Sequence, residues 1–529
     1  MKRFISRNNS IKPIKLSTLR HIAAVGYQHR GAGNGDKTDA DEKADWFRRE
    51  LAGNGDAVFR ELMLGGREGL EAVLVYLYGN IDKSTLNMSV IKPLMEFDGA
   101  KGLDRSSVPM QKKIIEGCLI VGKISSLSSR EAARDEIFRG KVILIVKGIA
   151  SYISLEVGGG KARQVTEPEN EKTLRGSKEG FIEDIWNNIA IIRKTLPAPD
   201  LKVELFEVGR RTKTKLSVIY LQSLADDKLV QEVKRRIKKI DIDGILANGY
   251  VEAFIEDNPY SPFPQAQGTE KPDKVAAALL EGRVAIVLDR TPLALLVPAQ
   301  FVQFFQAPED YFERSYMGTY IRILRVLAFI VTTTAAPAYI ALTSFHPELV
   351  PLDLLLNIAT LRKEVQFPPI VEALLMEFVI ESLREAGLRL PTSVSTTLGV
   401  VGGIILGDAA VSSNLVSAAM IIVITITIIC NFVIPNYSMS LVIRLLRLFL
   451  IIAAATFGAF GITLVWLMII IHLCRLESFG LPYFSPLGPT RFRDLKDVFI
   501  RVPAWAMQQR PDSIPAKDKQ RVKYNREKK

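Results

Sequence analysis

The chain has 529 residues, of which 48% are hydrophobic and 24% charged, and it carries a net charge of +12. This length exceeds that of one compact domain and predicts two or three domains. Three cysteines (Cys118, Cys430 and Cys474) and four scattered histidines exclude a disulfide framework and a metal-ligand cluster. We therefore expect a protein of a reducing compartment that needs no structural metal or cofactor.

The N-terminal part of the chain is predicted to hold a first α/β subdomain. Residues 1–45 are basic and then rich in Gly, Asn and Asp, which indicates disorder. Residues 46–156 contain two strand-like runs and one helical pattern, at Ala72–Tyr78, Lys141–Val146 and Thr85–Phe97. Residues 157–170 have the composition of a linker, and their Gly-Gly-Gly-Lys run lacks the spacing of a phosphate-binding loop.

A second α/β subdomain is predicted over residues 171–300. Leu201–Phe206 and Lys215–Leu221 have the pattern of paired strands around Gly209, and Asp226–Lys239 has that of a helix. Two further apolar runs follow, separated by a turn, at Val284–Leu288 and Leu293–Val297. Neither subdomain assembles a nucleophile with a base or a set of metal ligands, so we expect no enzyme activity.

Long uncharged apolar runs begin near Arg322 and predict an all-α transmembrane domain over residues 301–486. Four runs are predicted to cross the membrane, at Ile323–Phe345, Thr396–Val411, Leu415–Ile434 and Leu448–Ile471. The segment Phe367–Ser382 carries three acids after two prolines, which favours an interfacial or re-entrant helix over a fifth span. The predicted fold class is therefore a two-part soluble α/β region followed by about four transmembrane helices.

The positive charge is concentrated at the two ends of the chain. Residues 1–30 contain seven Lys or Arg and no acid, and residues 487–529 form a basic tail. Beside transmembrane helices, such ends indicate the cytoplasmic side and contact with anionic lipid headgroups. We therefore expect both termini in the cytoplasm, membrane lipids as partners, and no nucleic-acid partner.

Small residues recur at every fourth position along one predicted transmembrane helix, at Ser395, Gly399, Gly403 and Gly407. Such a stripe lets a neighbouring backbone approach closely. The column beside the stripe holds Val400, Ile404, Asp408 and Val411. An acid in hydrocarbon costs at least about 2.5 kcal/mol unless it faces water, a partner or an ion. The column is a candidate pore lining or gate if the glycines pack one copy against the next; the alternative is a buried, hydrogen-bonded Asp408.

Three further acids lie close to the membrane, at Glu372, Glu377 and Glu381. Their simplest role is to pair with Arg384 or Arg389. Arg444 and Arg447 lie about one turn apart at the edge of a predicted span, where side chains are expected to snorkel towards the headgroups.

A series of longer motifs runs from about Glu167 to Arg501. They include NPYSPFPQ at Asn258–Gln265, TEKPD at Thr269–Asp273, LLEGRVAIVLDRTP at Leu279–Pro292, HPELVP at His346–Pro351, EAGLRLP at Glu385–Pro391, LGVVGGIILGDAAV at Leu398–Val411 and ESFGLPYFSP at Glu477–Pro486. In order and spacing these motifs resemble those of the A subunits of GerA-type spore germinant receptors. Departures from the family pattern are Ser177, Lys271, Gln366 and Asp408, of which the last changes the charge of the candidate pore helix.

The resemblance implies a multi-pass subunit of a nutrient receptor in the spore inner membrane. Such A subunits act with a transporter-like B subunit, which binds the nutrient, and with a lipoprotein C subunit. They are expected to self-associate into a ring that conducts monovalent cations and so starts germination. Two alternatives stay open, a SpoVAF-type amplifying channel subunit and a non-conducting scaffold of the receptor complex. A secondary transporter is disfavoured because no internal repeat with broken helices is visible.

Overall fold

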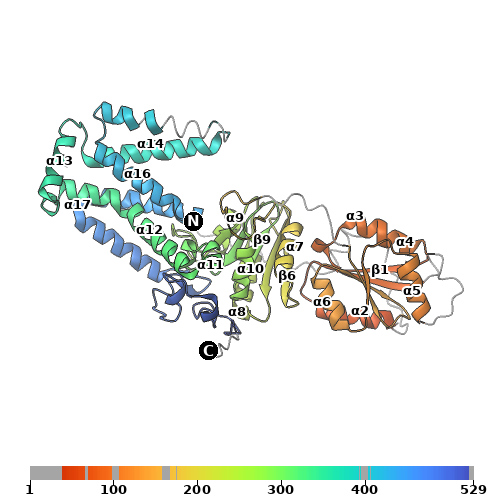
Figure 1. Cartoon of the computed structure of the whole chain (residues 1–529). Coiled ribbons are helices and arrows are strands. Elements are labelled where there is room, and N and C mark those ends of the chain that lie inside the picture. The colour runs from red at the N-terminus through yellow and green to blue at the C-terminus, as the bar shows by residue number, and fades with distance from the viewer. Residues whose placement is uncertain are drawn as a thin grey trace, which may run out of the picture. The chain divides into compact units, whose positions relative to one another are not determined.

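The computed structural model describes residues 39–65, 70–97, 107–157, 167–173, 175–391, 394, 403–405 and 407–522. The chain divides into two compact units. The α/β unit comprises Met1–Asp257, Ala266–Pro298 and Gln509–Lys523. The helical unit comprises Asn258–Gln265 and Ala299–Gln508 (Figure 1).

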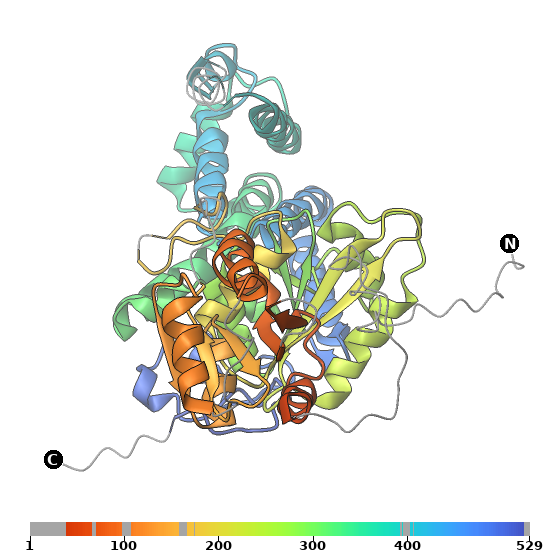
Figure 2. The same cartoon turned by 90° about the vertical axis from the view of Figure 1, so that its right-hand side faces the viewer.

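The first subdomain of the α/β unit is a five-stranded antiparallel sheet with helices on both faces (Figures 1 and 2). The strands follow the order β1-β2-β4-β5-β3, with bounds β1 Ala57–Leu64, β2 Leu70–Leu77, β3 Ile124–Leu127, β4 Val142–Val146 and β5 Tyr152–Leu155. The helices are α2 Asp39–Glu50, α3 Lys83–Thr85, the π-helical turn η2 Leu86–Ile91, α4 Lys92–Met95, α5 Ser107–Gly117 and α6 Arg130–Phe138.

The two faces of this sheet bury different side chains of the same strands. Leu74 and Leu144 pack with the core formed by η2, α4 and α5, whereas Val73 and Ile143 pack with α2 and α6. Successive side chains of a strand point to opposite faces, so a strand that is covered on both sides needs apolar residues throughout. The unbroken run VILIV of β4 meets this requirement, and all five of its residues are buried.

The second subdomain repeats the topology of the first. Its strands follow the order β6-β7-β9-β10-β8, with bounds β6 Leu201–Val208, β7 Thr214–Leu221, β8 Gln267–Thr269, β9 Val284–Leu288 and β10 Ala294–Val297. Its helices are α7 Ile185–Thr195, α8 Asp227–Lys239, α9 Asn248–Ile255 and α10 Pro272–Leu280. Counted within each sheet, both orders are 1-2-4-5-3 and all pairs are antiparallel. The α/β unit thus contains the same sheet topology twice, which the sequence pattern did not reveal.

A buried ion pair joins the two subdomains. Two nitrogens of the Arg193 guanidinium, Nε and Nη2, donate to Asp56 at 2.7 and 2.8 Å, and Nη2 also donates to Asn54. The two side chains are 1% and 0% exposed. Because both charges are removed from water, each depends on the other for compensation.

The predicted strands and helices of both subdomains are confirmed, and two boundaries differ. Helix α2 begins at Asp39, inside the 1–45 segment that composition assigned to disorder, because Ala40, Ala44 and Phe47 form an apolar face that packs on the first sheet. The basic tail predicted over 487–529 also contains a structured part. Residues 509–523 belong to the α/β unit, where Lys517 Nζ donates to Asp227 at 2.8 Å.

The helical unit contains long apolar helices connected by short ones. Their bounds are α11 Glu309–Phe312, α12 Ser315–Ser344, α13 Leu352–Arg362, α14 Pro369–Arg389, α16 Ala418–Phe432 and α17 Tyr437–Arg475, together with a short helix Gly403–Ser412. A two-stranded ribbon, β11 Glu477–Ser478 and β12 Leu481–Pro482, follows α17. Helix α12 packs against α16 and α17 at the centre of the unit.

Helix α17 reverses direction at Gly458, where φ is +59° and ψ is −140°. Residues near its two ends meet in one core, which contains Met439 and Leu446 from the first arm and Ile469 and Leu473 from the second. A Cβ at Gly458 would lie 2.9 Å from Phe345 Cβ, and positive φ is readily adopted only by glycine. The reversal divides α17 into two arms, residues 437–457 and 459–475. At 1.5 Å per residue the arms are about 31 and 25 Å long, close to the thickness of the hydrocarbon core.

Among the described residues, two helices, α12 and α17, are long and apolar enough to cross a membrane. The structure differs from the predicted single crossing at Leu448–Ile471, because the reversal at Gly458 lies inside that run. The run Leu415–Ile434 corresponds to the shorter apolar helix α16, and Phe367–Ser382 lies mostly within α14. The number of spans stays a prediction.

Candidate functional site

The candidate pore lining lies on the short helix Gly403–Ser412 and is described in part. Three of the predicted residues lie outside the described part of the chain, namely Ser395, Gly399 and Val400. The described members are Gly403 and Gly407 of the small-residue stripe and Ile404, Asp408 and Val411 of the column beside it. The structure therefore describes only the C-terminal half of the predicted stripe and column.

The three described members of the column beside the glycines are exposed or half-buried among the described residues. Ile404 is 67% exposed, Asp408 is exposed and Val411 is half-buried. Asp408 makes no ion pair or hydrogen bond with any described residue. The alternative prediction was a buried, hydrogen-bonded Asp408. The described residues of one chain neither bury Asp408 nor bond to it.

The two described glycines of the stripe, Gly403 and Gly407, have free space beside them among the described residues. A Cβ built on Gly403 or Gly407 would meet no described atom within 4 Å. Neither glycine is therefore needed for packing inside the described part of a single chain. A face of glycines beside an apolar column suits the close approach of another backbone.

The first membrane-proximal acid, Glu372 on α14, is fully buried and bound on two sides. Its carboxylate lies 3.1 Å from Arg362 Nη2 and accepts a hydrogen bond from the backbone N–H of Ser417 at 2.8 Å. Ser417 is the N-cap of α16, and its hydroxyl accepts from the N–H of Met420. A carboxylate at this position is favoured by the partial positive charge of the helix N-terminus. Glu372 therefore ties α13, α14 and α16 together.

The other two acids of α14 pair with arginines of α17. Glu377 accepts from Arg447 at 2.7 Å, and Glu381 accepts from Arg444 at 2.5 Å and from Arg384 at 3.0 Å. Arg447 is 2% exposed. The prediction that Arg444 and Arg447 snorkel towards headgroups is wrong, because both pair with acids of α14, a helix distant in sequence.

One of the predicted pairings is confirmed and the other is not. Glu381 does pair with Arg384, one turn further along α14. Arg389 instead pairs with Glu385 at 2.5 Å, an exposed contact with four-residue helical spacing. Pairing within a helix follows from spacing alone, whereas the partners of Glu372 and Glu377 depend on tertiary structure.

A second buried ionic group lies at the start of α12, and sequence reasoning missed its acids. Asp310 is 0% exposed and accepts from Arg322 Nε at 3.2 Å and from Arg325 Nη1 at 2.7 Å. Asp497 accepts from Arg322 Nη1 at 2.8 Å. The sequence did contain a sign of this group, because two arginines lie three residues apart at the edge of a long apolar run. Arginines in such a place need acidic partners if they face the protein interior.

Together these contacts give the helical unit two rigid ionic groups and one uncovered helix face. The acids of α14 fix α13, α14, α16 and α17 to one another, and Asp310 and Asp497 fix the start of α12. Asp408 on the helix Gly403–Ser412 and Asp353 on α13 are exposed acids for which the described residues show no partner. The described acids and arginines therefore form a framework that connects α12, α13, α14, α16 and α17 within the chain.

Comparison with known proteins identifies the family. Residues 45–513 match the family described as Bacillus/Clostridium GerA spore germination protein. The chain is 40% identical over 474 residues to spore germination protein KA of Bacillus subtilis (strain 168), covering 90% of this chain and 86% of that protein. It is 36% identical over 474 residues to spore germination protein B1 of the same organism, covering 90% and 97%.

A solved structure also matches. The crystal structure of the N-terminal domain of the A subunit of the Bacillus megaterium spore germinant receptor GerK3 is 31% identical to this chain. The match covers 52% of this chain and 100% of that domain, with a TM-score of 0.39. From the family match over residues 45–513 and the identity to both Bacillus subtilis proteins, this chain belongs to the GerA family of spore germination proteins.

Proposed function

We propose that this chain is the A subunit of a nutrient germinant receptor in the spore inner membrane, and that copies of it assemble into a cation channel. The family match and the relatives named as spore germination proteins support the receptor role. In this proposal the chain acts together with B and C subunits, and the nutrient binds the B subunit. Both termini of this chain lie in the cytoplasm.

The observation that carries the channel proposal is Asp408. It is an exposed acid on an apolar helix and has no described partner within the chain. Facing hydrocarbon alone, such a charge would cost at least about 2.5 kcal/mol. An ion path shared between copies would supply water and cations, which lower the cost of the Asp408 charge. A ring of such carboxylates attracts cations rather than anions.

The uncovered glycines support assembly around the same helix. Gly403 and Gly407 leave room for a neighbouring backbone on the face beside Ile404 and Asp408. If copies meet through this face, the Ile404 and Asp408 column lies next to the interface. Nutrient binding then opens the path only if it favours one arrangement of these helices over the other.

The proposal is tested in spores that carry this receptor as their only one. Nutrient-triggered release of monovalent cations is measured for the wild type, for a deletion of this chain and for Asp408→Asn. We expect release to disappear in the deletion and to be slowed or changed in ion preference by Asp408→Asn. The matched control is Asp353→Asn, which removes an exposed acid from α13 and is expected to leave release unchanged.

Each alternative predicts a different result in the same experiment. A non-conducting scaffold predicts loss of release in the deletion but normal rate and ion preference in Asp408→Asn. An amplifying channel subunit predicts no release when this chain and its partners form the only receptor, and faster release when another receptor is restored.

A further inference from the structure

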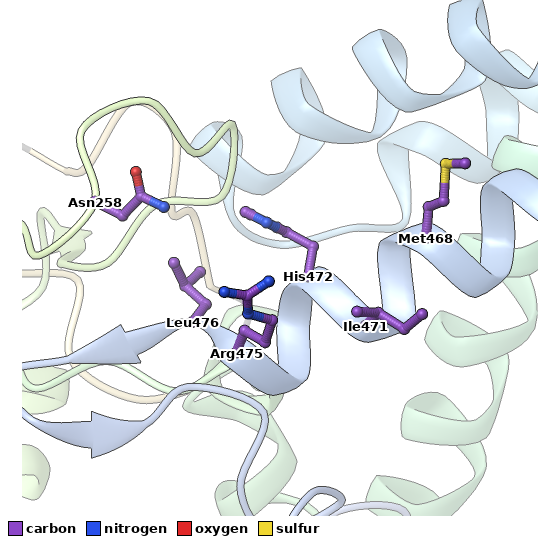
Figure 3. Close-up of a pocket in the computed structure, with 6 residues that line it drawn as sticks. All are labelled: Asn258, Met468, Ile471, His472, Arg475 and Leu476. Carbon is purple, nitrogen blue, oxygen red and sulfur yellow. The ribbon is translucent and has the colours of Figure 1, made fainter.

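A pocket of about 450 Å³ lies at the C-terminal end of α17 (Figure 3). It is lined by Asn258, Met468, Ile471, His472, Arg475 and Leu476. All six belong to the helical unit, five from α17 and the residue after it and one from the loop Asn258–Gln265. Neither the channel proposal nor the ionic groups of α14 use these residues.

The polar side of the pocket presents hydrogen-bond donors. Arg475 is exposed and makes no ion pair or hydrogen bond with any described residue. The Asn258 side-chain oxygen accepts from the N–H of Tyr260 at 3.3 Å, which leaves the amide nitrogen to face the pocket. Figure 3 shows this nitrogen on the side towards His472 and Arg475. None of the six lining residues carries a carboxylate, so the pocket complements an anion.

The loop that forms one wall is held in place by its own contacts. Gln265 bonds both backbone groups of Asn258, accepting from N–H at 2.9 Å and donating to C=O at 2.6 Å. Ser261 Oγ lies 2.8 Å from His472 Nε2 and accepts from the N–H of Phe263 at 3.2 Å. The Asn258 donor is therefore positioned before any ligand arrives, which lowers the entropy cost of binding to it.

The other side of the pocket is apolar and continues along a candidate membrane helix. Met468 and Ile471 are 57% and 50% exposed, and Leu464 and Leu467 one turn further back are also exposed. These residues lie on the second arm of α17. Tyr260, at the tip of the loop, is 96% exposed, as is typical of an aromatic side chain at the level of lipid headgroups.

An anion site joined to an apolar surface selects an amphiphile. A free anion would use Arg475 and Asn258 but would leave Met468 and Ile471 uncovered. A zwitterionic or neutral lipid would cover the apolar side but would gain less from a site of donors with no acid. We propose that this pocket binds the phosphate headgroup of an anionic phospholipid, whose acyl chains lie along the second arm of α17.

The test uses the purified full chain in detergent and native mass spectrometry with phosphatidylglycerol and phosphatidylcholine. We expect phosphatidylglycerol to be retained at roughly tenfold lower concentration than phosphatidylcholine. A tenfold difference in affinity is about what one charge-assisted hydrogen bond contributes. Arg475→Gln should remove this preference, and Arg475→Lys should keep part of it. The control Arg389→Gln removes an exposed arginine from the same unit and should leave the preference intact.

A second arm separates a lipid from a free phosphate ester. Ile471→Ser should weaken retention of phosphatidylglycerol, because the acyl chain loses its contact, and soluble glycerol 3-phosphate should fail to displace the lipid at matched concentration. Displacement by glycerol 3-phosphate, or equal retention of both lipids by the wild type and by Arg475→Gln, would overturn the proposal. The lipid proposal is tested by lipid retention, whereas the channel proposal is tested by cation release. A failure of one proposal is therefore distinguishable from a failure of the other.

Discussion

Glu377 of α14 and Arg447 of α17 form a 2.7 Å ion pair in which the arginine side chain is 2% exposed. The two residues are distant in sequence, and their contact fixes α14 against the first arm of α17. Arg447 is removed from bulk water and Glu377 is only 18% exposed, so the arginine depends on this acid for compensation.

Loss of the acid from this pair should destabilise the helical unit. We expect Glu377→Gln to lower the free energy of unfolding by about 3–5 kcal/mol, because it leaves Arg447 buried and uncompensated. The measurement is thermal unfolding of the purified chain in detergent. The double variant Glu377→Leu with Arg447→Met should recover most of the loss, since apolar side chains of similar volume replace both charges.

The matched control lies on the same helix. Glu385→Gln breaks the exposed pair with Arg389 and should cost less than about 1 kcal/mol. Equal effects of Glu377→Gln and Glu385→Gln would show that the Glu377–Arg447 pair is not buried in the folded protein.

The pair between Asp56 and Arg193 should govern how firmly the two α/β subdomains hold together. Asp56→Asn leaves Arg193 buried without a full charge partner and should cost about 3–5 kcal/mol. We expect faster proteolysis of the chain between the subdomains, measured by limited digestion. Glu116→Gln, which breaks an exposed pair with Lys112, should leave the digestion rate unchanged, and an unchanged rate in Asp56→Asn as well would contradict the role given to this pair.

The stability of the α/β unit should fall as pH rises from about 4.5 to 7. Burial raises the pKa of Glu252 to about 7, and the nearby Glu256 carboxylate adds to the effect. In that pH window the folded state holds a proton that the unfolded state has released, so the free energy of unfolding decreases with pH. Glu252→Gln should flatten the decrease and leave the variant more stable than the wild type at pH 8, as measured by thermal unfolding.

Glu232→Gln controls for the loss of a carboxylate on a neighbouring helix. Hydrogen bonds from Arg235 and Arg236 hold the pKa of Glu232 at about 2, so this group stays ionised throughout the window. Its removal should leave the slope of stability against pH as in the wild type. Equal slopes of stability against pH in the wild type and in Glu252→Gln would contradict the raised pKa of Glu252.

Copies of the chain should meet through the glycine face of the helix Gly403–Ser412. In a background with Cys118, Cys430 and Cys474 replaced by serine, Gly403→Cys should form a cross-linked dimer on mild oxidation of spore membranes. Ser412→Cys lies nine residues further on, about 180° around the helix, and should cross-link far less. Cross-linking that is equal at the two positions, or absent from both, would place the interface elsewhere.

Much of the α/β unit could be predicted from the sequence. Apolar runs bounded by turns identified β2, β4, β6, β7, β9 and β10, and the glycine at position 209, with φ of +85°, marks the predicted hairpin. Such elements are encoded locally, because burial on one or both faces dictates the pattern of apolar residues. The shared topology of the two sheets was not predictable in this way, because strand order depends on tertiary pairing and not on the local pattern of apolar residues.

The helical unit was harder to predict, for two physical reasons. The reversal at Gly458 lies within an unbroken apolar run, and glycine is common in membrane helices, so composition gives no sign of it. The partners of Glu377 and Arg322 are residues far away in sequence, and only the packing of the helices brings the charges together. The acids themselves were recognisable because charges near hydrocarbon need compensation.

The most direct test of the channel proposal is the ion selectivity of the reconstituted receptor, with this chain and its partner subunits in one bilayer. Nutrient-dependent permeability to monovalent cations and to chloride is compared for the wild type, Asp408→Asn and Asp408→Glu. The account predicts a cation preference that falls several-fold in Asp408→Asn and is retained in Asp408→Glu. An unchanged permeability ratio in Asp408→Asn would contradict it and would remove Asp408 from the ion path.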